Sequence, residues 1–269
     1  MLFGGIDIGS LTAQAVIIEE PDGKSARLKI HTKSIRVKPD PVESAKEVMG
    51  ALLKDIGINW EYMKYVVSTG YGRERVQQEG LSHDNISEIS CHGAGAFALY
   101  PNVRTVIDIG GQDAKVIRVG PGGELENFVM NDKCAAGTGR FLEVMSKTIG
   151  TDYEKLGFLA LKSRNRFELS SRCSIFAENE VLHYLQRGAS VEDLAAGISR
   201  SMADRVMALA RRVGVEREVM MTGGVAKNVA VKAELEKKLG LRIVSPSLDP
   251  QLIGAYGAAV LARRSWRES

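Results

Sequence analysis

The sequence predicts an α/β protein built from two similar lobes, and a repeated strand, turn, strand unit is the main reason. Residues 2–8 form an apolar strand that ends in a glycine turn, and residues 12–18 follow as its hairpin partner. Residues 105–109 and 114–119 repeat this unit about a hundred residues later. Because tandem repeat arrays have shorter periods, the spacing indicates a duplicated, two-lobed chain.

The predicted lobes and the main helices follow from changes in the residue pattern. We place residues 1–101 in the first lobe and residues 102–253 in the second. A helix is expected over residues 41–56, where apolar residues recur at helical spacing. A final helix over residues 254–266 is expected to pack back on the first lobe.

Further strands are predicted from short apolar runs bounded by turn residues. The region after Cys134 is otherwise expected to be helical. The runs are residues 26–37 and 65–68, with a loop over residues 69–73 after the second, and residues 166–169, 218–221 and 242–244.

The composition excludes several classes of protein. The chain has 269 residues, of which 44% are hydrophobic and 26% charged, and no apolar run approaches the roughly 20 residues that cross a bilayer. The net charge of +3 is spread along the chain, which argues against nucleic-acid binding. The first residues enter a strand pattern without a secretory signal, so we expect no membrane association and a cytoplasmic location.

Three glycine-rich turns, at residues 7–12, 108–113 and 222–228, each follow an apolar strand. Glycine lets backbone N–H groups approach a ligand closely, and such groups cradle phosphate oxygens. Asp7 and Asp108 stand just before the first two turn glycines, where a carboxylate can hold hydrated Mg²⁺ against the phosphates. Any one turn is as easily a tight hairpin, but the three together favour a nucleotide site.

This pattern resembles the phosphate-1, phosphate-2 and adenosine motifs of the superfamily that includes acetate kinase, sugar kinases, the Hsp70 ATPase domain and actin. The resemblance implies two ribonuclease-H-like lobes, with ATP or ADP in the cleft between them and hinge closure linked to the nucleotide. Gln112 or Asp113 would orient the attacking water. The residues expected to bind phosphate, Mg²⁺ or adenosine are Asp7, Gly9, Ser10, Thr12, Asp108, Gly110, Gly111, Gln112, Gly223, Gly224, Asn228 and Gly254.

Two of the three cysteines, Cys134 and Cys173, precede helical patterns. A thiolate at a helix N-terminus is stabilised by the helix dipole, and Lys133 and Arg172 lie directly before the two thiols. Two cysteines cannot fill the four-cysteine shell of an iron–sulfur cluster, but twofold symmetry would double them. One cluster shared by a homodimer is therefore a hypothesis; small buried cysteines, or four thiols on a structural zinc ion, are the alternatives.

Seven segments carry a closer resemblance: GIDIGS, STGYGR, EISCHGAGA, TVIDIGGQDAKVI, NDKCAAGTGRFLEVM, CSIFAENEVL and MTGGVAKN. They resemble the activator component of 2-hydroxyacyl-CoA dehydratases, a family shared with the ATPase subunits of benzoyl-CoA reductase and the reductase of double-cubane cluster proteins. The match runs from Gly5 to Ala259. It implies that Cys134 and Cys173 of both subunits bind one 4Fe-4S cluster at the dimer interface, and that ATP changes the angle between the adjoining helices.

The function that this resemblance implies is an ATPase coupled to electron transfer. A ferredoxin or flavodoxin would reduce the cluster, and ATP would drive the electron on to a partner iron–sulfur enzyme under oxygen-free conditions. That partner would be a 2-hydroxyacyl-CoA dehydratase, a benzoyl-CoA reductase or a double-cubane cluster protein. A small-molecule kinase of the same ATPase fold is the alternative. Cys91 and His92 are expected to have a packing role, with a mononuclear zinc site as the other interpretation.

Overall fold

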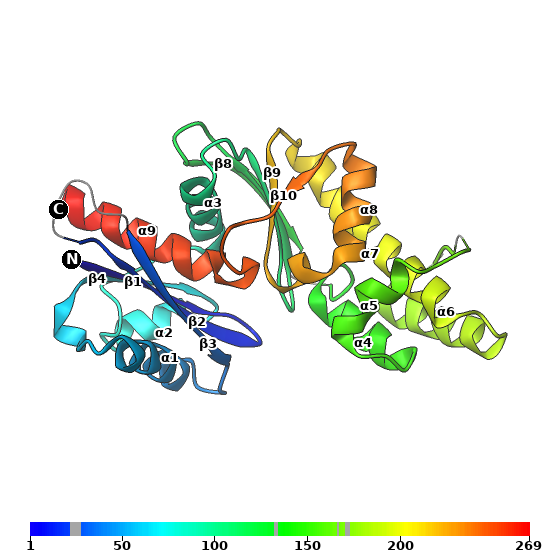
Figure 1. Ribbon diagram of the computed structural model, residues 1–269, viewed down its shortest axis with the longest axis horizontal. Coiled ribbons are helices and arrows are strands. Elements are labelled where there is room, and N and C mark those ends of the chain that lie inside the picture. The colour runs from blue at the N-terminus through cyan, green and yellow to red at the C-terminus, as the bar shows by residue number, and fades with distance from the viewer. Residues whose placement is uncertain (22–27, 132–133, 166, 170–172) are drawn as a thin grey trace. The chain divides into compact units, whose positions relative to one another are not determined.

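The computed structural model describes residues 1–21, 28–131, 134–165, 167–169 and 173–269. The chain divides into two compact units, each with its own sheet (Figure 1). The first unit contains Met1–Val103, Val119–Leu125 and Pro246–Ser269, and the second contains Arg104–Arg118 and Glu126–Ser245. The first unit therefore includes three segments, residues 102–103, 119–125 and 246–253, that the sequence assigned to the second lobe.

The sheet of the first unit has the strand order β3-β2-β1-β4-β5. The central strand β1 pairs antiparallel with β2 and parallel with β4, and all of its residues are buried. A continuous run of apolar and small residues is what a strand covered on both faces requires. The strands are β1 (Leu2–Ile8), β2 (Thr12–Glu19), β3 (Lys29–Arg36), β4 (Met63–Gly70) and β5 (Asp84–Asn85).

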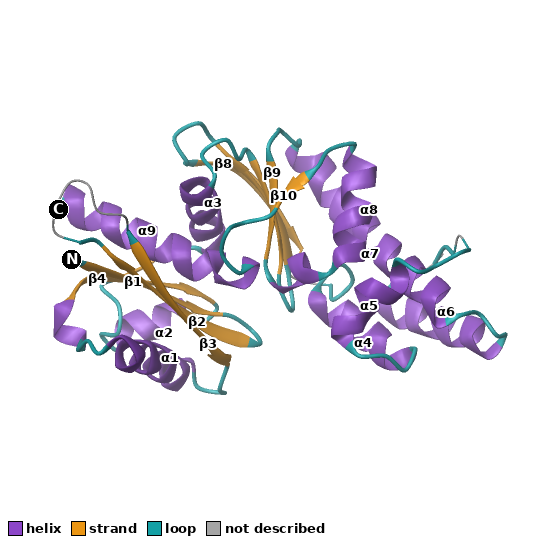
Figure 2. Cartoon of the chain, viewed as in Figure 1, coloured by secondary structure: helices purple, strands orange, loops and turns teal. Residues whose placement is uncertain are grey.

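The sheet of the second unit repeats this topology. Its order is β10-β9-β6-β7-β8, and its central strand β6 pairs antiparallel with β7 and parallel with β9 (Figure 2). Each strand thus has a counterpart at the same place in the first sheet, which confirms the duplicated α/β architecture. The strands are β6 (Thr105–Ile109), β7 (Ala114–Val119), β8 (Leu125–Asn131), β9 (Val219–Thr222) and β10 (Ile243–Val244).

Helices cover both faces of the first sheet. Ala15 and Ile17 of β2 belong to the apolar cluster under α1, whereas Val16 and Ile18 belong to the cluster under α9. This alternation follows from the two-residue period of a strand. α9 also packs against α3. The helices are α1 (Pro41–Ile56), α2 (Arg73–Gln78), α3 (Glu88–Leu99) and α9 (Ile253–Glu268), with 3-10 turns at Trp60–Tyr62 and Pro250–Leu252.

α1 occupies the residues that the sequence predicted. It starts at Pro41, where the missing N–H costs nothing, and Asp40 caps it by accepting a hydrogen bond from the Val42 N–H at 2.9 Å. It ends at Gly57, whose φ of 69° lies in the left-handed region that favours glycine.

Glycines allow the backbones of α3 and α9 to approach closely. A Cβ atom added at Gly257 would lie 1.7 Å from the Cys91 carbonyl oxygen. We predict that Gly257→Ala lowers the free energy of unfolding by about 1–3 kcal/mol, because α9 must move away from α3. Chemical denaturation checks this. Gly50→Ala, at a position of α1 with open space around it, is the matched control and should not be destabilised. Equal stability of the two variants would contradict the close contact.

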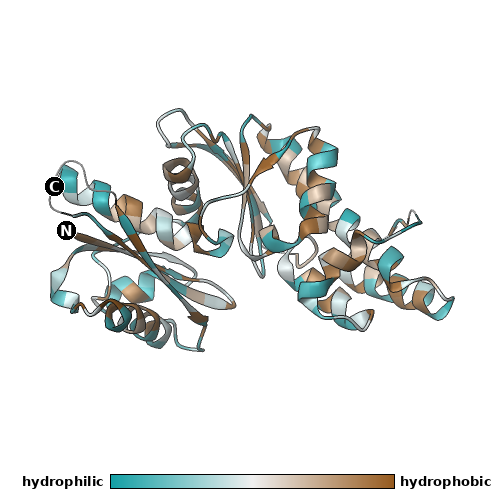
Figure 3. Cartoon of the chain, viewed as in Figure 1, coloured by the Kyte–Doolittle hydropathy of each residue, from teal (hydrophilic) through white to brown (hydrophobic). Residues whose placement is uncertain are grey.

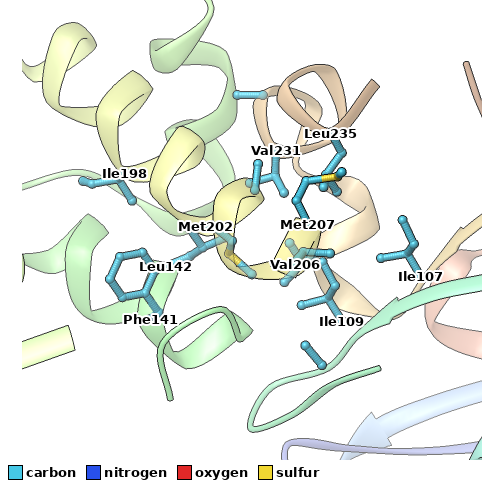
Figure 4. Close-up of a cluster of buried hydrophobic side chains, with 14 of the residues drawn as sticks. Ile107, Ile109, Phe141, Leu142, Ile198, Met202, Val206, Met207, Val231 and Leu235 are labelled. Atoms are coloured by element: carbon cyan, nitrogen blue, oxygen red, sulfur yellow. The ribbon is translucent and has the colours of Figure 1, made fainter. Parts of the chain in front are cut away.

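The second unit has a helical core around the long helix α7. Phe141 and Leu142 of α4 pack with Ile198 and Met202 of α7 (Figure 4). On the other side of α7, the cluster continues to Ile107 of β6. The helices are α4 (Gly139–Thr148), α5 (Tyr153–Ala160), α6 (Ser174–Gln186), α7 (Val191–Val213) and α8 (Val229–Leu239), with a 3-10 turn at Gly224–Lys227.

Apolar residues concentrate along the central strands, while the helices mix apolar and hydrophilic residues (Figure 3). This is the pattern of helices that pack one face on a core. Among the residues that the structure describes, no helix is both long and apolar enough to cross a membrane.

Two predicted segments differ from the structure. The loop predicted over residues 69–73 is wrong at both ends, because β4 pairs with β1 as far as Gly70 and α2 begins at Arg73. The strand predicted over residues 166–169 is wrong for residues 167–169, where the Phe167 ring packs edge-on against Tyr184 instead of joining a sheet. Arg166 and the first two residues of the predicted third strand lie outside the described residues.

Candidate functional site

The first glycine-rich turn, in the first unit, and the second, in the second unit, contain the same backbone hydrogen bond. Gly9 donates its N–H to the Thr12 carbonyl oxygen at 3.0 Å, and Gly110 donates its N–H to the Asp113 carbonyl oxygen at 3.0 Å. Each turn connects the central strand of its sheet to the antiparallel neighbour. The duplication therefore extends from strand order to the individual turn.

A further glycine lies beside each turn, at the end of the parallel strand. Gly70 and Gly223 have φ values of 82° and 81°, in the left-handed region. A Cβ atom would lie 2.5 Å from Asp7 Oδ1 if added at Gly70, and 2.8 Å from Asp108 Oδ1 if added at Gly223. Gly70 was not among the predicted site residues, although the dipeptide Thr-Gly occurs at both positions.

In the second unit, a buried lysine joins two carboxylates of the second turn. Lys115 is 1% exposed, and its Nζ lies 2.6 Å from Asp113 Oδ1 and 3.3 Å from Asp108 Oδ2. Thr222 donates its hydroxyl to Asp108 Oδ1 at 2.9 Å. The strand register explains this cluster, because Asp108 lies opposite Lys115 on β7 and Thr222 on β9.

In the first unit, the corresponding aspartate lies opposite a neutral side chain. Asp7 pairs in register with Gln14 on β2. Gln14 is 4% exposed and donates its Nε2 to the Thr12 hydroxyl at 2.6 Å. Gly254, at the start of α9, lies next to Asp7, because a Cβ atom added there would be 2.3 Å from Asp7 Oδ2 and 3.0 Å from His92 Nε2.

Gln112 and Asp113 differ in exposure. Asp113 is 3% exposed and paired with Lys115, whereas the Gln112 side chain is exposed at the tip of the turn. An exposed amide can meet a ligand or a water molecule directly. Of the two residues predicted to orient the attacking water, the geometry favours Gln112.

The third turn continues into the cap of α8. Asn228 Oδ1 accepts hydrogen bonds from the N–H groups of Ala230 and Val231 at 3.2 and 3.1 Å, which makes it the helix cap. Gly223 and Gly224 begin the 3-10 turn before it. The contact of these three residues with adenosine stays a prediction.

The second turn is hydrogen-bonded to the start of α4. Gly139 donates its N–H to the Gly110 carbonyl oxygen, and Arg140 donates its N–H to the Gly111 carbonyl oxygen, both at 2.8 Å. The first N–H groups of a helix have no partner within the helix, so the turn satisfies two of them. A Cβ atom at Gly139 would lie 3.0 Å from the Gly110 oxygen, so glycine permits this contact.

Cys134 is exposed in the loop that precedes α4. Asn131 fixes this loop by donating its Nδ2 to the carbonyl oxygens of Cys134 and Ala136 at 2.9 and 3.0 Å. Cys134 precedes a helix, as the sequence predicted. It does not lie at the helix N-terminus, because α4 begins only at Gly139, where the second turn accepts its N–H groups.

Cys173 is exposed at the N-cap of α6, as the sequence predicted for a thiol at a helix start. Its carbonyl oxygen accepts the Ala177 N–H at 2.9 Å. Beside it, Ile175 and Phe176 are 68% and 66% exposed. The predicted basic neighbours, Lys133 and Arg172, lie outside the described residues.

Arg205 on α7 links the two exposed thiols electrostatically. Burial lowers the pKa of its guanidinium, while the charges of Cys134, Cys173 and Asp204 act to raise that pKa. The guanidinium lies 4.8 Å from the centroid of the Phe141 ring. Within one chain, the described residues include no group of three or more His, Cys, Asp or Glu side chains that could hold a metal ion.

Cys91 has the contacts of a packing residue. It is fully buried in an apolar cluster with Phe3, Val67 and Ala258. Burial raises the pKa of its thiol to about 12, which keeps it protonated.

Known proteins resemble the chain over nearly its full length. The (R)-2-hydroxyglutaryl-CoA dehydratase activating ATPase of Acidaminococcus fermentans is 45% identical over 258 residues, which cover 96% of this chain and 95% of that protein. The 2-hydroxyisocaproyl-CoA dehydratase activator of Clostridioides difficile is 42% identical, covering 98% and 96%. One of the subunits of the benzoyl-CoA reductase of Thauera aromatica is 31% identical, covering 95% and 91%.

Solved structures agree with these similarities. Component A of the (R)-2-hydroxyglutaryl-CoA dehydratase of A. fermentans has a TM-score of 0.91 with 42% identity, and the match covers 99% of both chains. The C. difficile activator with bound ADPNP has a TM-score of 0.88 with 41% identity, covering 100% of this chain and 96% of that one. The two mixed sheets with their helices are those of the actin-like ATPase fold. Residues 5–262 match the BadF/BadG/BcrA/BcrD ATPase family, and the chain belongs to that family.

Proposed function

We propose that this chain is an ATP-dependent activator that passes one electron from a 4Fe-4S cluster to a partner iron–sulfur enzyme. In this proposal, Cys134 and Cys173 of two copies hold one cluster in a homodimer. Relatives that are dehydratase activators, and one that belongs to a benzoyl-CoA reductase, support the class of partner.

The strongest support for this proposal comes from the hydrogen bonds between the second turn and α4. Gly110 and Gly111 accept the N–H groups of Gly139 and Arg140, and the loop that holds Cys134 leads directly into this helix. A change in the turn on loss of the γ-phosphate therefore moves the start of α4 and the cysteine loop. Loss of a γ-phosphate commonly moves loops in this way.

The residues present fit an iron–sulfur cluster. Two exposed thiols per chain become four in a twofold dimer, the number that a 4Fe-4S cluster requires. The exposed Ile175 and Phe176 beside Cys173 give an apolar surface that a second copy would cover. Such a cluster would supply one-electron chemistry at low potential.

The nucleotide residues have separate tasks in this proposal. The first turn, with Asp7 before Gly9, binds phosphate and hydrated Mg²⁺. The second turn binds phosphate at Gly111, because the N–H of Gly110 is already bonded to the Asp113 carbonyl oxygen. Gln112 orients the water that attacks the γ-phosphate, so ATP and water give ADP and phosphate. Gly223, with its neighbours in the third turn, contacts adenosine. A cytoplasmic ferredoxin or flavodoxin supplies the electron, and the partner's iron–sulfur centre accepts it.

The experiment that tests this function measures ATP turnover and redox change in one oxygen-free sample. The proposal predicts ADP and phosphate release with no phosphoryl acceptor other than water, and bleaching of the visible absorbance by one electron per dimer on reduction with dithionite. Consumption of ATP only after addition of a small-molecule alcohol, with no bleaching, would contradict it and favour a kinase.

A further inference from the structure

The end of α5 exposes two large apolar side chains. Phe158 is 60% exposed, and Leu161, directly after the helix, is 58% exposed. The other side of the helix is in the core, because Leu156 and Ala160 belong to the main apolar cluster of the second unit. Residues three apart in a helix are neighbours on its surface, so the two exposed side chains lie side by side. An exposed apolar surface bordered by polar residues is typical of a contact site.

The chain that follows α5 carries two cations beside these side chains. Lys162 and Arg164 are both exposed, and neither forms an ion pair with a residue that the structure describes. Lys155 of α5, by contrast, pairs with Asp152 at 2.6 Å. The helix itself carries one acid, Glu154, in its first turn. The two cations after the helix can therefore attract an acid of another molecule without first breaking an ion pair.

A single aspartate holds the loop that carries Arg164. Asp193, in the first turn of α7, accepts hydrogen bonds at Oδ1 from the N–H groups of Arg164 and Asn165, at 3.1 and 3.0 Å. It also accepts the Ser163 hydroxyl at 2.7 Å and the Asn165 side-chain amide at 2.9 Å. Hydrogen bonds from Asn165 and Ser163 lower the pKa of the Asp193 carboxyl, so it stays ionised. The loop is thus ordered before a partner binds, which reduces the entropy cost of binding.

The α5 patch, meaning Phe158, Leu161, Lys162 and Arg164, has the features of a small, transient contact surface. Stable interfaces use about 20–30 residues a side, whereas weak electron-transfer complexes bury less surface. Charged residues around such a contact steer a partner of opposite charge into place. The net charge of +3 on the whole chain adds to this attraction. The patch therefore suits an acidic protein that binds and leaves quickly.

Along α7, the α5 patch and the exposed thiols are separated by less than the width of a small protein. Asp193, which holds the patch, and Arg205 both lie on α7. The charges of Cys134 and Cys173 act on the Arg205 guanidinium. From residue 193 to residue 205, α7 is about 18 Å long at about 1.5 Å per residue. An interface of about 800 Å² per partner is about 30 Å across, so one docked protein is wide enough to span this length.

We propose that the α5 patch is the docking surface for the electron donor, a small acidic one-electron carrier of the ferredoxin or flavodoxin class. Lys162 and Arg164 attract the acidic face of the carrier, and Phe158 and Leu161 contact its apolar side chains. One electron leaves the carrier, which is oxidised, and enters the cluster, which is reduced, while no bond in this chain forms or breaks. This inference rests on the proposed function, which supplies the cluster.

The first part of the test measures binding and needs no cluster in this chain. Fluorescently labelled, oxidised ferredoxin and flavodoxin, each with a negative net charge, are titrated with the protein, and anisotropy gives the dissociation constant. Lys162→Glu with Arg164→Glu should raise this constant by about 10-fold or more at low salt. The effect should shrink at about 1 M salt, where the screening length is about 3 Å.

A second variant tests the apolar part of the α5 patch. Phe158→Ser with Leu161→Ser should raise the dissociation constant by about 10-fold, because exposed aromatic and aliphatic anchors supply much of the binding energy of a small interface. No charge is removed, so this effect should be similar at low and high salt. Both side chains are exposed, and the variant should hydrolyse ATP at the wild-type rate, which checks that it folds.

Lys46→Glu with Lys64→Glu is the matched control for the charge reversal. Both lysines are exposed in the first unit, and neither pairs with a residue that the structure describes. The double substitution changes the net charge by the same amount as the patch variant, so it should alter carrier binding by less than about threefold. Cytochrome c, a basic one-electron carrier, is the control for the charge of the partner and should not bind.

The second part of the test follows electron transfer in the oxygen-free, cluster-containing protein. With reduced ferredoxin below saturation, stopped-flow absorbance should show that both patch variants are reduced about 10-fold more slowly than the wild-type protein. Dithionite needs no docking surface, so it should bleach the patch variants to the same final extent as the wild-type protein.

The inference is overturned if neither acidic carrier binds the wild-type protein, if the charge-reversed patch variant binds as tightly as the wild type, or if the control variant loses binding equally. A protein that binds ferredoxin through the patch but contains no iron would contradict the proposed electron transfer and leave the docking surface standing. Bleaching by dithionite, together with wild-type rates of reduction of the patch variants by ferredoxin, would contradict the docking surface alone.

Discussion

Replacing Cys134 or Cys173 with serine is expected to remove essentially all iron from the oxygen-free protein. Both thiols are exposed, and each chain of the proposed dimer supplies two of the four cluster ligands. Because each substitution removes one ligand from each chain, the dimer keeps only two of the four. Iron, acid-labile sulfide and visible absorbance measure this effect. ADP affinity should change by less than about threefold, because turns in other segments of the chain form the proposed nucleotide site.

Cys91→Ala is the matched control for the two cysteine variants. Cys91 is buried among apolar side chains, where alanine is a small replacement, so this variant should keep its iron. Retention of iron by either serine variant, or its loss from Cys91→Ala, would show that the ligands are wrongly assigned.

Gln112→Ala is expected to slow ATP hydrolysis on the order of 100-fold, the usual cost of misplacing a reacting group. Its side chain is exposed on the second turn. Backbone hydrogen bonds hold this turn in place, one from the Gly110 N–H to the Asp113 carbonyl oxygen and two from the first N–H groups of α4. The amide can therefore be removed without moving the turn. ADP affinity should stay unchanged, so the loss appears in kcat.

Leu11→Ala controls for a general effect on the glycine turns. Leu11 is exposed at the corresponding position of the first turn, and its loss should leave kcat unchanged. Equal hydrolysis rates for Gln112→Ala and the wild-type protein would show that Gln112 does not orient the attacking water and that another group does.

The sequence predicted those parts of the fold that depend on local pattern. β1 and β6 are fully buried runs that lead into Asp-Ile-Gly, so both the strands and the duplication were visible. α1 was predicted to the residue from apolar residues at helical spacing, and in the structure a capping aspartate, an N-terminal proline and a C-terminal glycine mark its ends.

The sequence did not predict the features that depend on tertiary contacts. β8 is largely exposed and shows no apolar period, so nothing in its residues marked a strand. A lysine in a strand ordinarily faces solvent, and Lys115 is buried because the register places it against Asp108 and Asp113. α4 begins after Cys134 rather than at it, because its first N–H groups bind a turn distant in the sequence.

The most direct test of the central claim is the mass and metal content of the wild-type protein purified without oxygen. Two chains that share one cluster require a dimer with about four iron and four acid-labile sulfide atoms, and a brown colour. A monomer that lacks iron and sulfide would contradict the claim.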